Sequence, residues 1–72
     1  MENPKVERPA WLKGAILSHL SRMYADGVDD TKVLQLALTV EFGLTISQAI
    51  MAVTYWRTPK EYREENAVNH GV

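Results

Sequence analysis

A single glycine separates two apolar segments in the middle of the chain. The stretch "EFGLTISQAI" places Gly43 after Phe42 and then offers Thr45 and Gln48 at the spacing of a capping box. Glycine ends helices because it adopts a left-handed backbone at little steric cost, and a Thr followed three residues later by Gln satisfies free amides of a new helix. The stretch therefore predicts a helix that stops, a tight turn, and a second helix that starts at once.

Similar start and stop signals divide the rest of the chain. Pro9 suits a first helical position and Gly27 a helix end. Asp29 and Asp30 offer acids at the next helix N-terminus, and Thr58 with Glu61 suits another helix start. Between these signals, apolar residues recur at helical spacing. The chain is expected to form an all-α bundle of three main helices, at about 9–26, 31–42 and 46–57, plus a short fourth helix at about 59–66. One helical domain then spans 9–66, with an extended arm at 1–8 and a flexible tail at 67–72.

The length of 72 residues places this domain near the lower limit for folding on one apolar core. Such a core rarely supplies more than about 3–5 kcal/mol, and the absence of cysteine excludes disulfides and thiolate metal sites. Oligomerisation or a bound partner is the remaining source of stability. The polar N-terminus is unlike a signal peptide, and no run of apolar residues is long enough to span a membrane, so we expect a cytoplasmic protein without a membrane partner.

The second predicted helix is apolar around most of its circumference. Lys32, Gln35 and Thr39 form a narrow polar stripe, and the apolar residues occupy the remaining positions. The apolar residues are Val33, Leu34, Leu36, Ala37, Leu38, Val40 and Phe42. Such a helix lies centrally in a bundle or at the seam of a dimer, and both alternatives are open. The β-branched residues also leave open a strand at "LTVEF".

Nothing in the sequence predicts catalysis. His19 has no acid at helical spacing that could orient it, so it is expected to be a boundary residue. Asp26, Asp29 and Asp30 lack the further ligands of a calcium-binding loop, and helix capping explains them. We therefore expect a protein that is not an enzyme, with no metal, no cofactor and no small-molecule substrate.

Residues 35–54 resemble a helix-turn-helix through Thr39, Gly43, Leu44, Ala49 and Ala52. The resemblance implies a dimeric DNA-binding regulator whose third helix enters the major groove. The cations available for phosphate contacts would be Lys32, Arg57, Lys60 and Arg63. Against this reading, the net charge is −1, and the outer face of the third helix has no Arg or Lys.

The same turn also resembles that of ubiquitin-associated domains, which are three-helix modules that bind protein surfaces. The resemblance is carried by Gly43-Leu44, Ala49 and Ala52-Val53. It implies that residues 42–44 form a contact loop. The sequence departs from this family after Tyr62, where charged residues replace the expected apolar pair.

The uncharged outer face of the third helix is the leading candidate site. Its predicted members are Ser47, Gln48, Met51, Thr54 and Tyr55, opposite a predicted buried face of Ile46, Ala49, Ile50, Ala52, Val53 and Trp56. Aromatic and Met side chains are enriched at interfaces, and charges are depleted at their cores. We therefore expect a small regulatory protein that binds another protein or itself, as a homodimer. The alternative is that Met51 and Tyr55 pack against the arm or the fourth helix.

Overall fold

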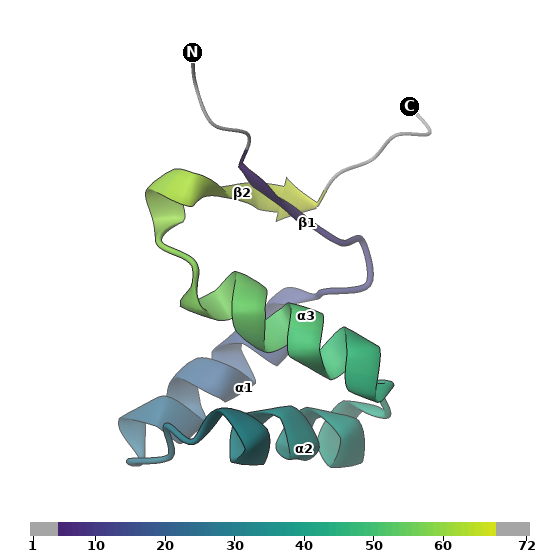
Figure 1. Ribbon diagram of the computed structural model, residues 1–72, viewed down its shortest axis with the longest axis vertical. Coiled ribbons are helices and arrows are strands. Elements are labelled where there is room, and N and C mark those ends of the chain that lie inside the picture. Colours follow the sequence, from purple (N-terminus) through teal and green to yellow (C-terminus); the bar gives the residue numbers. More distant parts are fainter. Residues whose placement is uncertain (1–4, 68–72) are drawn as a thin grey trace.

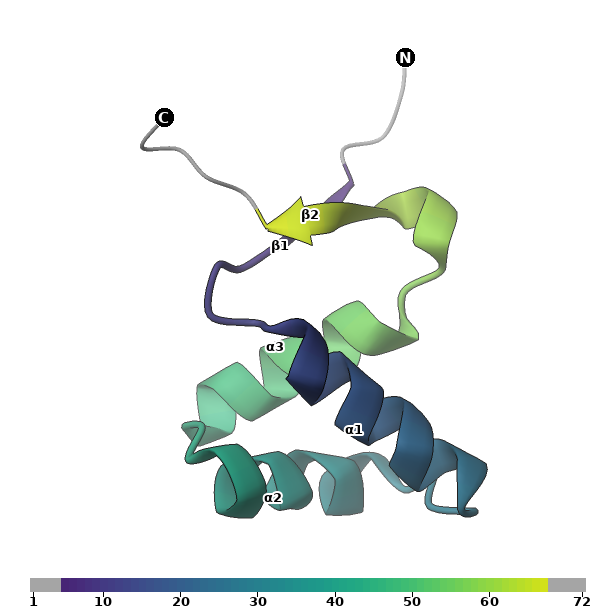
Figure 2. The ribbon, with the colours of Figure 1, turned by 180° about the vertical axis from the view of Figure 1, so that it is seen from behind.

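The computed structural model describes residues 5–67 and is mostly helical, which confirms the predicted small all-α bundle. Its elements are β1 (Val6–Arg8), α1 (Gly14–Ala25), α2 (Thr31–Phe42), α3 (Ile46–Arg57), the 3-10 helix η1 (Lys60–Tyr62) and β2 (Arg63–Ala67). The two strands pair in parallel at one end of the molecule. Figures 1 and 2 show α1 and α3 beneath this sheet and α2 at the opposite end. Residues 1–4 of the predicted arm and 68–72 of the predicted tail lie outside the described residues.

α1 ends as its glycine predicts. Gly27 has a positive φ of 95° and donates its amide hydrogen to the carbonyl of Tyr24 at 3.0 Å. The amide of Val28 reaches back to the carbonyl of Met23, also at 3.0 Å. These two bonds form a Schellman motif, and the half-buried side chains of Val28 and Met23 both pack against the core.

The predicted bounds of α2 and α3 match the structure. The carboxylate of Asp30 accepts the amide hydrogens of Lys32 and the following residue at 2.9 and 3.2 Å. Gly43 ends α2 in the left-handed conformation, with φ of 66°. Thr45 and Gln48 form the expected capping box, each side chain accepting the other's amide hydrogen at 3.1 and 3.0 Å. The alternative of a strand at "LTVEF" is wrong, because local capping fixes a helix there.

α1 begins later than predicted, at Gly14 instead of Pro9. A tight turn comes first, in which the amide of Leu12 donates to the carbonyl of Pro9 at 3.0 Å. The carbonyl of Leu12 accepts a hydrogen bond from Nε of Arg8 at 2.8 Å, and the Leu12 side chain is buried. The turn and the arginine contact delay the helix, and neither is encoded in the apolar spacing.

The predicted fourth helix at 59–66 is wrong. The hydroxyl of Thr58 donates to the carbonyl of Thr54 at 2.8 Å, so this side chain completes α3 and does not cap a new helix. One 3-10 turn follows, and the chain then extends as β2 beside β1, with Val6 opposite Arg63. Pairing between distant strands overrides a local start signal here.

The core forms where the three helices meet. It consists of Leu12, Ile16, Leu20, Leu34, Leu38, Ala49, Ala52, Val53 and Tyr55. α2 buries only Leu34 and Leu38, so the other helices do not enclose it. None of the helices within residues 5–67 combines the length and apolar character needed to cross a membrane.

Candidate functional site

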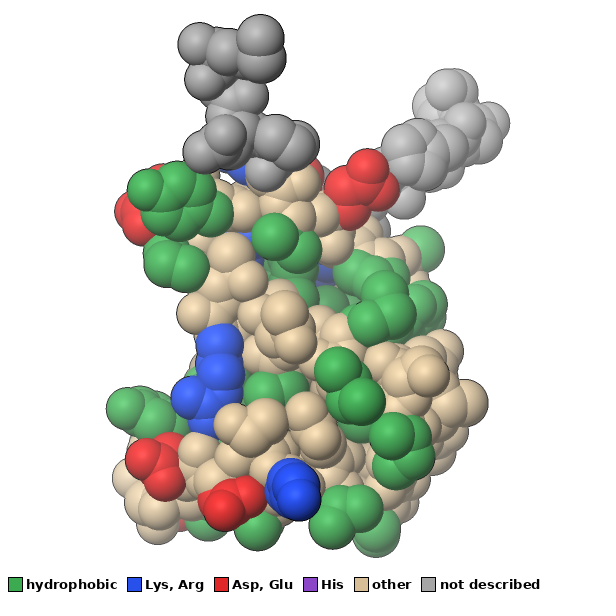
Figure 3. Space-filling view, viewed as in Figure 1, with side chains coloured by type: hydrophobic (Ala, Val, Ile, Leu, Met, Phe, Trp, Pro, Cys, Tyr) green, Lys and Arg blue, Asp and Glu red, His purple; other side chains and the backbone are tan. Residues whose placement is uncertain are grey.

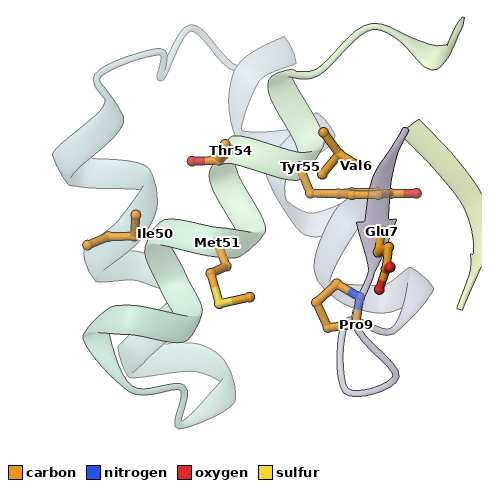
Figure 4. Close-up of a pocket in the computed structure, with 7 residues that line it drawn as sticks. All are labelled: Val6, Glu7, Pro9, Ile50, Met51, Thr54 and Tyr55. Carbon is orange, nitrogen blue, oxygen red and sulfur yellow. The ribbon is translucent and has the colours of Figure 1, made fainter. Parts of the chain in front are cut away.

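A hollow of about 180 Å³ lies between β1 and α3. We call it the β1–α3 groove, and its lining residues are Val6, Glu7, Pro9, Ile50, Met51, Thr54 and Tyr55 (Figure 4). The strand and the residue after it supply one wall, and two turns of α3 supply the other. Most of these side chains are apolar, so the groove suits an apolar occupant.

Tyr55 connects α3 to β2, the strand that pairs with β1. Its side chain is buried, and its hydroxyl donates a hydrogen bond to the backbone carbonyl of Glu64 in β2. Figure 4 shows the ring running from α3 past β1 toward β2. The guanidinium of Arg63 lies 5.0 Å from the centre of this ring, which adds a cation–π contact.

Arg63 fastens β2 to the end of α3. Its Nη1 donates to the carbonyls of Tyr55 and Trp56 at 3.1 and 3.0 Å. These carbonyls belong to the last turn of the helix, where cationic side chains are favoured by the helix dipole. Since β1 pairs with β2, both walls of the groove are held by bonds within the chain, and the site is pre-formed.

The mouth of the groove is built from half-exposed apolar side chains. Met51 is 50% exposed and Ile50 is 45% exposed, although both belong to a helix that packs on the core. Thr54 follows Ile50 by one turn and adds a hydroxyl, and Val6 is exposed on the facing strand. A partner can therefore reach the groove from solvent and contact both walls at once.

The structure brings together three of the five residues predicted for the interface. Met51 and Thr54 line the mouth of the groove, and Tyr55 forms its buried base. The predicted exposure of Tyr55 is wrong, and the alternative of packing against the arm holds for this residue because β1 and β2 cover it. Ser47 is exposed outside the groove, and the half-buried Gln48 is engaged in the capping box.

Four lining residues were not predicted as site residues: Val6, Glu7, Pro9 and Ile50. The first three of these reach the groove because β1 pairs with β2, a strand near the other end of the described chain. The sequence predicts Ile50 in the core together with Ile46, but both are exposed. The buried face of α3 is rotated relative to the predicted one, so that it includes Tyr55 in their place. The sequence already placed Gln48 in a capping box, and a side chain bound there is less available to contact a partner.

The four residues predicted to contact phosphate differ in whether their side chains are already bound within the fold. Lys32 and Lys60 are exposed. Arg57 donates to the backbone carbonyl of Asp29 at 2.7 Å, and its guanidinium lies 5.5 Å from the ring centre of Trp56. Arg63 is half-buried against the end of α3. Two of the four cations are thus bound within the fold.

A second hollow, of about 310 Å³, lies beside the turn between α2 and α3. Its lining residues are Trp11, Lys13, Ala15, Ile16, Phe42 and Leu44. Two members of the contact loop expected from the resemblance to ubiquitin-associated domains, Phe42 and Leu44, line it. The ring of Phe42 also meets His19 edge to face, with 5.5 Å between centroids. His19 therefore has an aromatic neighbour, in keeping with a boundary residue.

The described residues hold no group of three or more His, Asp or Glu side chains that could bind a metal ion. A comparison with family models, curated proteins and solved structures finds no match to this chain. The resemblances to helix-turn-helix and ubiquitin-associated domains stay predictions.

Proposed function

We propose that this chain is a small non-enzymatic regulatory protein that binds a partner protein by taking one of its apolar side chains into the β1–α3 groove. The observation that carries the proposal is the exposure of Met51 and Ile50 at the mouth of a pre-formed apolar hollow. Aliphatic side chains exposed in this way are typical of interaction sites when they surround a concave surface.

The size of the groove favours a side chain over a cofactor. Sites for cofactors and other small molecules usually enclose about 300–1,000 Å³. The groove measures about 180 Å³. An apolar cavity of roughly 150 Å³ is large enough for one benzene molecule. The groove therefore has room for one aliphatic or aromatic side chain, with the rest of the partner outside.

The chemistry of the walls also favours an uncharged partner. Thr54 offers a hydroxyl to a backbone group of the partner, and Met51 has a flexible thioether that adapts to different shapes. Glu7 is the only charged residue among those lining the groove. A leucine, isoleucine or phenylalanine side chain on the partner matches these walls best.

The first test uses a defined probe, N-acetyl-phenylalanine methylamide, followed by NMR of methyl-labelled protein. The methyl signals of Val6, Ile50 and Met51 should shift together as the probe is added, because all three line one hollow. Ile46 is a matched internal control, since it is exposed on the same helix but does not line the groove. Shifts at Ile46 alone, or at no methyl group, would contradict the proposal.

The second test addresses the protein partner. A photo-crosslinking residue in place of Thr54 should form a discrete adduct in a lysate of the source cells. Met51→Glu should abolish that adduct, because it places a charge at the mouth of an apolar hollow. Ile46→Glu should preserve it, because position 46 is exposed and a carboxylate is favoured in the first turn of a helix. If both variants behave alike, the groove is not the binding site.

Binding of duplex DNA is the second candidate function. It is favoured by the turn at Gly43 and by the exposure of Ser47, Ile50, Met51 and Thr54 along one side of α3. DNA binding would give retention on mixed duplexes at low salt that falls steeply as salt rises. Absence of retention at micromolar protein would exclude this candidate and leave the protein-binding proposal intact.

A further inference from the structure

The side of α2 that faces away from the core carries a row of exposed aliphatic residues. Val33 is 47%, Leu36 56% and Val40 80% exposed, and we call these three residues the α2 stripe. α2 lies at the end of the molecule opposite the sheet (Figure 1). Figure 3 shows hydrophobic side chains along this lower end as well as over α3. The α2 stripe is therefore a separate surface from the β1–α3 groove.

The spacing of the α2 stripe is that of a helix that packs against another helix. Positions 33, 36 and 40 are separated by three and four residues, so they follow one side of the helix as core positions of a heptad do. Ala37 lies beside them and is small, which allows a neighbouring backbone to approach closely. The stripe therefore fits an α-helix as its occupant.

The charges around the stripe suit a second copy of the same surface. Residues 33–40 contain no charged side chain, and Lys32 and Glu41 lie at opposite ends of α2. A two-fold interface brings the same surface of both copies together, so a surface of like charges would repel itself, whereas this uncharged one does not. A helix that lies on a lipid surface usually carries several Lys or Arg residues beside its apolar side, and α2 has one.

We infer that two copies of this chain associate through their α2 stripes and form a two-fold symmetric dimer. This inference goes beyond the proposed function, because the stripe and the groove share no residue. Val40 is the most exposed large aliphatic residue among those described, and exposing such a side chain to water is unfavourable. Burial of Val40 in the dimer would remove this cost.

The available area indicates a dimer of modest affinity. Standard interfaces bury about 800 Å² on each partner, and weaker ones bury less than roughly 600 Å². The chain exposes 5189 Å² in all. One side of a helix about 18 Å long and about 10 Å across presents less area than the lower figure. The dimer should therefore form in the micromolar range and dissociate on dilution.

Sedimentation velocity between about 5 and about 500 micromolar tests the inference over the range expected for a weak interface. The parent chain should shift from its monomer mass of 8.2 kDa toward twice that value. Leu36→Lys should remain monomeric throughout, because it brings two ammonium groups together at the centre of the seam. Met51→Lys, a similarly exposed position on α3, should associate like the parent. Circular dichroism should confirm that both variants keep their helices.

A covalent test uses the absence of cysteine from the chain. Leu36→Cys should form a disulfide-linked dimer under mild oxidation at least tenfold faster than Met51→Cys at equal concentration, because position 36 lies at the middle of the stripe. Equal rates would overturn the inference, as would a parent chain that is monomeric at every concentration. A monomer that binds anionic phospholipid vesicles through Leu36 would also overturn it and identify a lipid surface as the occupant.

These outcomes are independent of the proposed function. Loss of the dimer in Leu36→Lys with normal binding of the probe supports both conclusions. Failure of the probe to bind, with the dimer intact, contradicts the groove alone.

Discussion

Tyr55 connects the helices of this fold to its sheet. The sequence predicts it as an exposed interface residue, because it lies one turn from Met51 on the uncharged side of the helix opposite the predicted buried face. In the structure it is buried, its hydroxyl donates to the carbonyl of Glu64, and the guanidinium of Arg63 lies over its ring. One side chain thus supplies apolar burial, a hydrogen bond and a cation–π contact at the base of the groove.

The hydroxyl of Tyr55 should be worth about 1 kcal/mol to the folded state, the usual net value of one hydrogen bond. Tyr55→Phe keeps the ring and removes that bond, so the free energy of unfolding in urea should fall by about this amount. The loss should be local, with faster amide exchange in β2 than in α2. Unchanged stability and unchanged exchange in β2 would show that the bond contributes nothing. Tyr55→Ala should cost about 3–5 kcal/mol and unfold much of the population.

At the scale of elements, the sequence predicted those helix ends that depend on neighbours within a few residues. The bounds of α2 and α3 follow from Asp30, Gly43 and the capping box that begins at Thr45, all of which act locally. The end of α1 follows from Gly27 in the same way. The groove could not be predicted in full, because Val6 comes to it through pairing with a strand more than fifty residues later.

Substitutions at two glycines test whether backbone conformation at single residues determines where helices begin and end. Gly43 has a φ of 66°, whereas Gly14 opens α1 without a positive φ, and a Cβ built on either meets nothing within 4 Å. Gly43→Ala should therefore destabilise the fold by about 1 kcal/mol through backbone strain alone. Gly14→Ala should stabilise it by about 0.4–1 kcal/mol, because alanine restricts the unfolded chain and favours helix.

Urea unfolding of the two glycine variants beside the parent measures both effects in one series. Gly43→Asn serves as a control, since asparagine tolerates the left-handed region better than alanine and should lose less stability. If both alanine variants change stability in the same direction, the left-handed backbone of Gly43 does not decide the outcome and the local explanation is wrong.

At the scale of the whole molecule, charge and apolar exposure are segregated along the chain. Between Lys32 and Arg57, Glu41 is the only charged residue, and this stretch includes nearly all of α2 and α3. Charged residues are concentrated in the segments before and after it. A domain with so small a core gains stability by covering exposed apolar surface, so the uncharged helix pair is where association should contribute most.

Association through the α2 stripe should make thermal stability depend on protein concentration, because a dimer that unfolds to two chains is favoured by mass action. Unfolding entropy of about 2.1 cal/mol/K per residue, summed over both chains, gives a rise in Tm of about 5 °C for each tenfold increase in concentration above the dissociation constant. Scanning calorimetry at about 50 and about 500 micromolar should show this rise for the parent and for Met51→Lys. Leu36→Lys should keep one Tm at both concentrations, close to that of the dilute parent. A parent chain whose Tm does not move would show that stability is a property of the single copy, and that the exposed aliphatic residues of α2 are tolerated without a partner of their own kind.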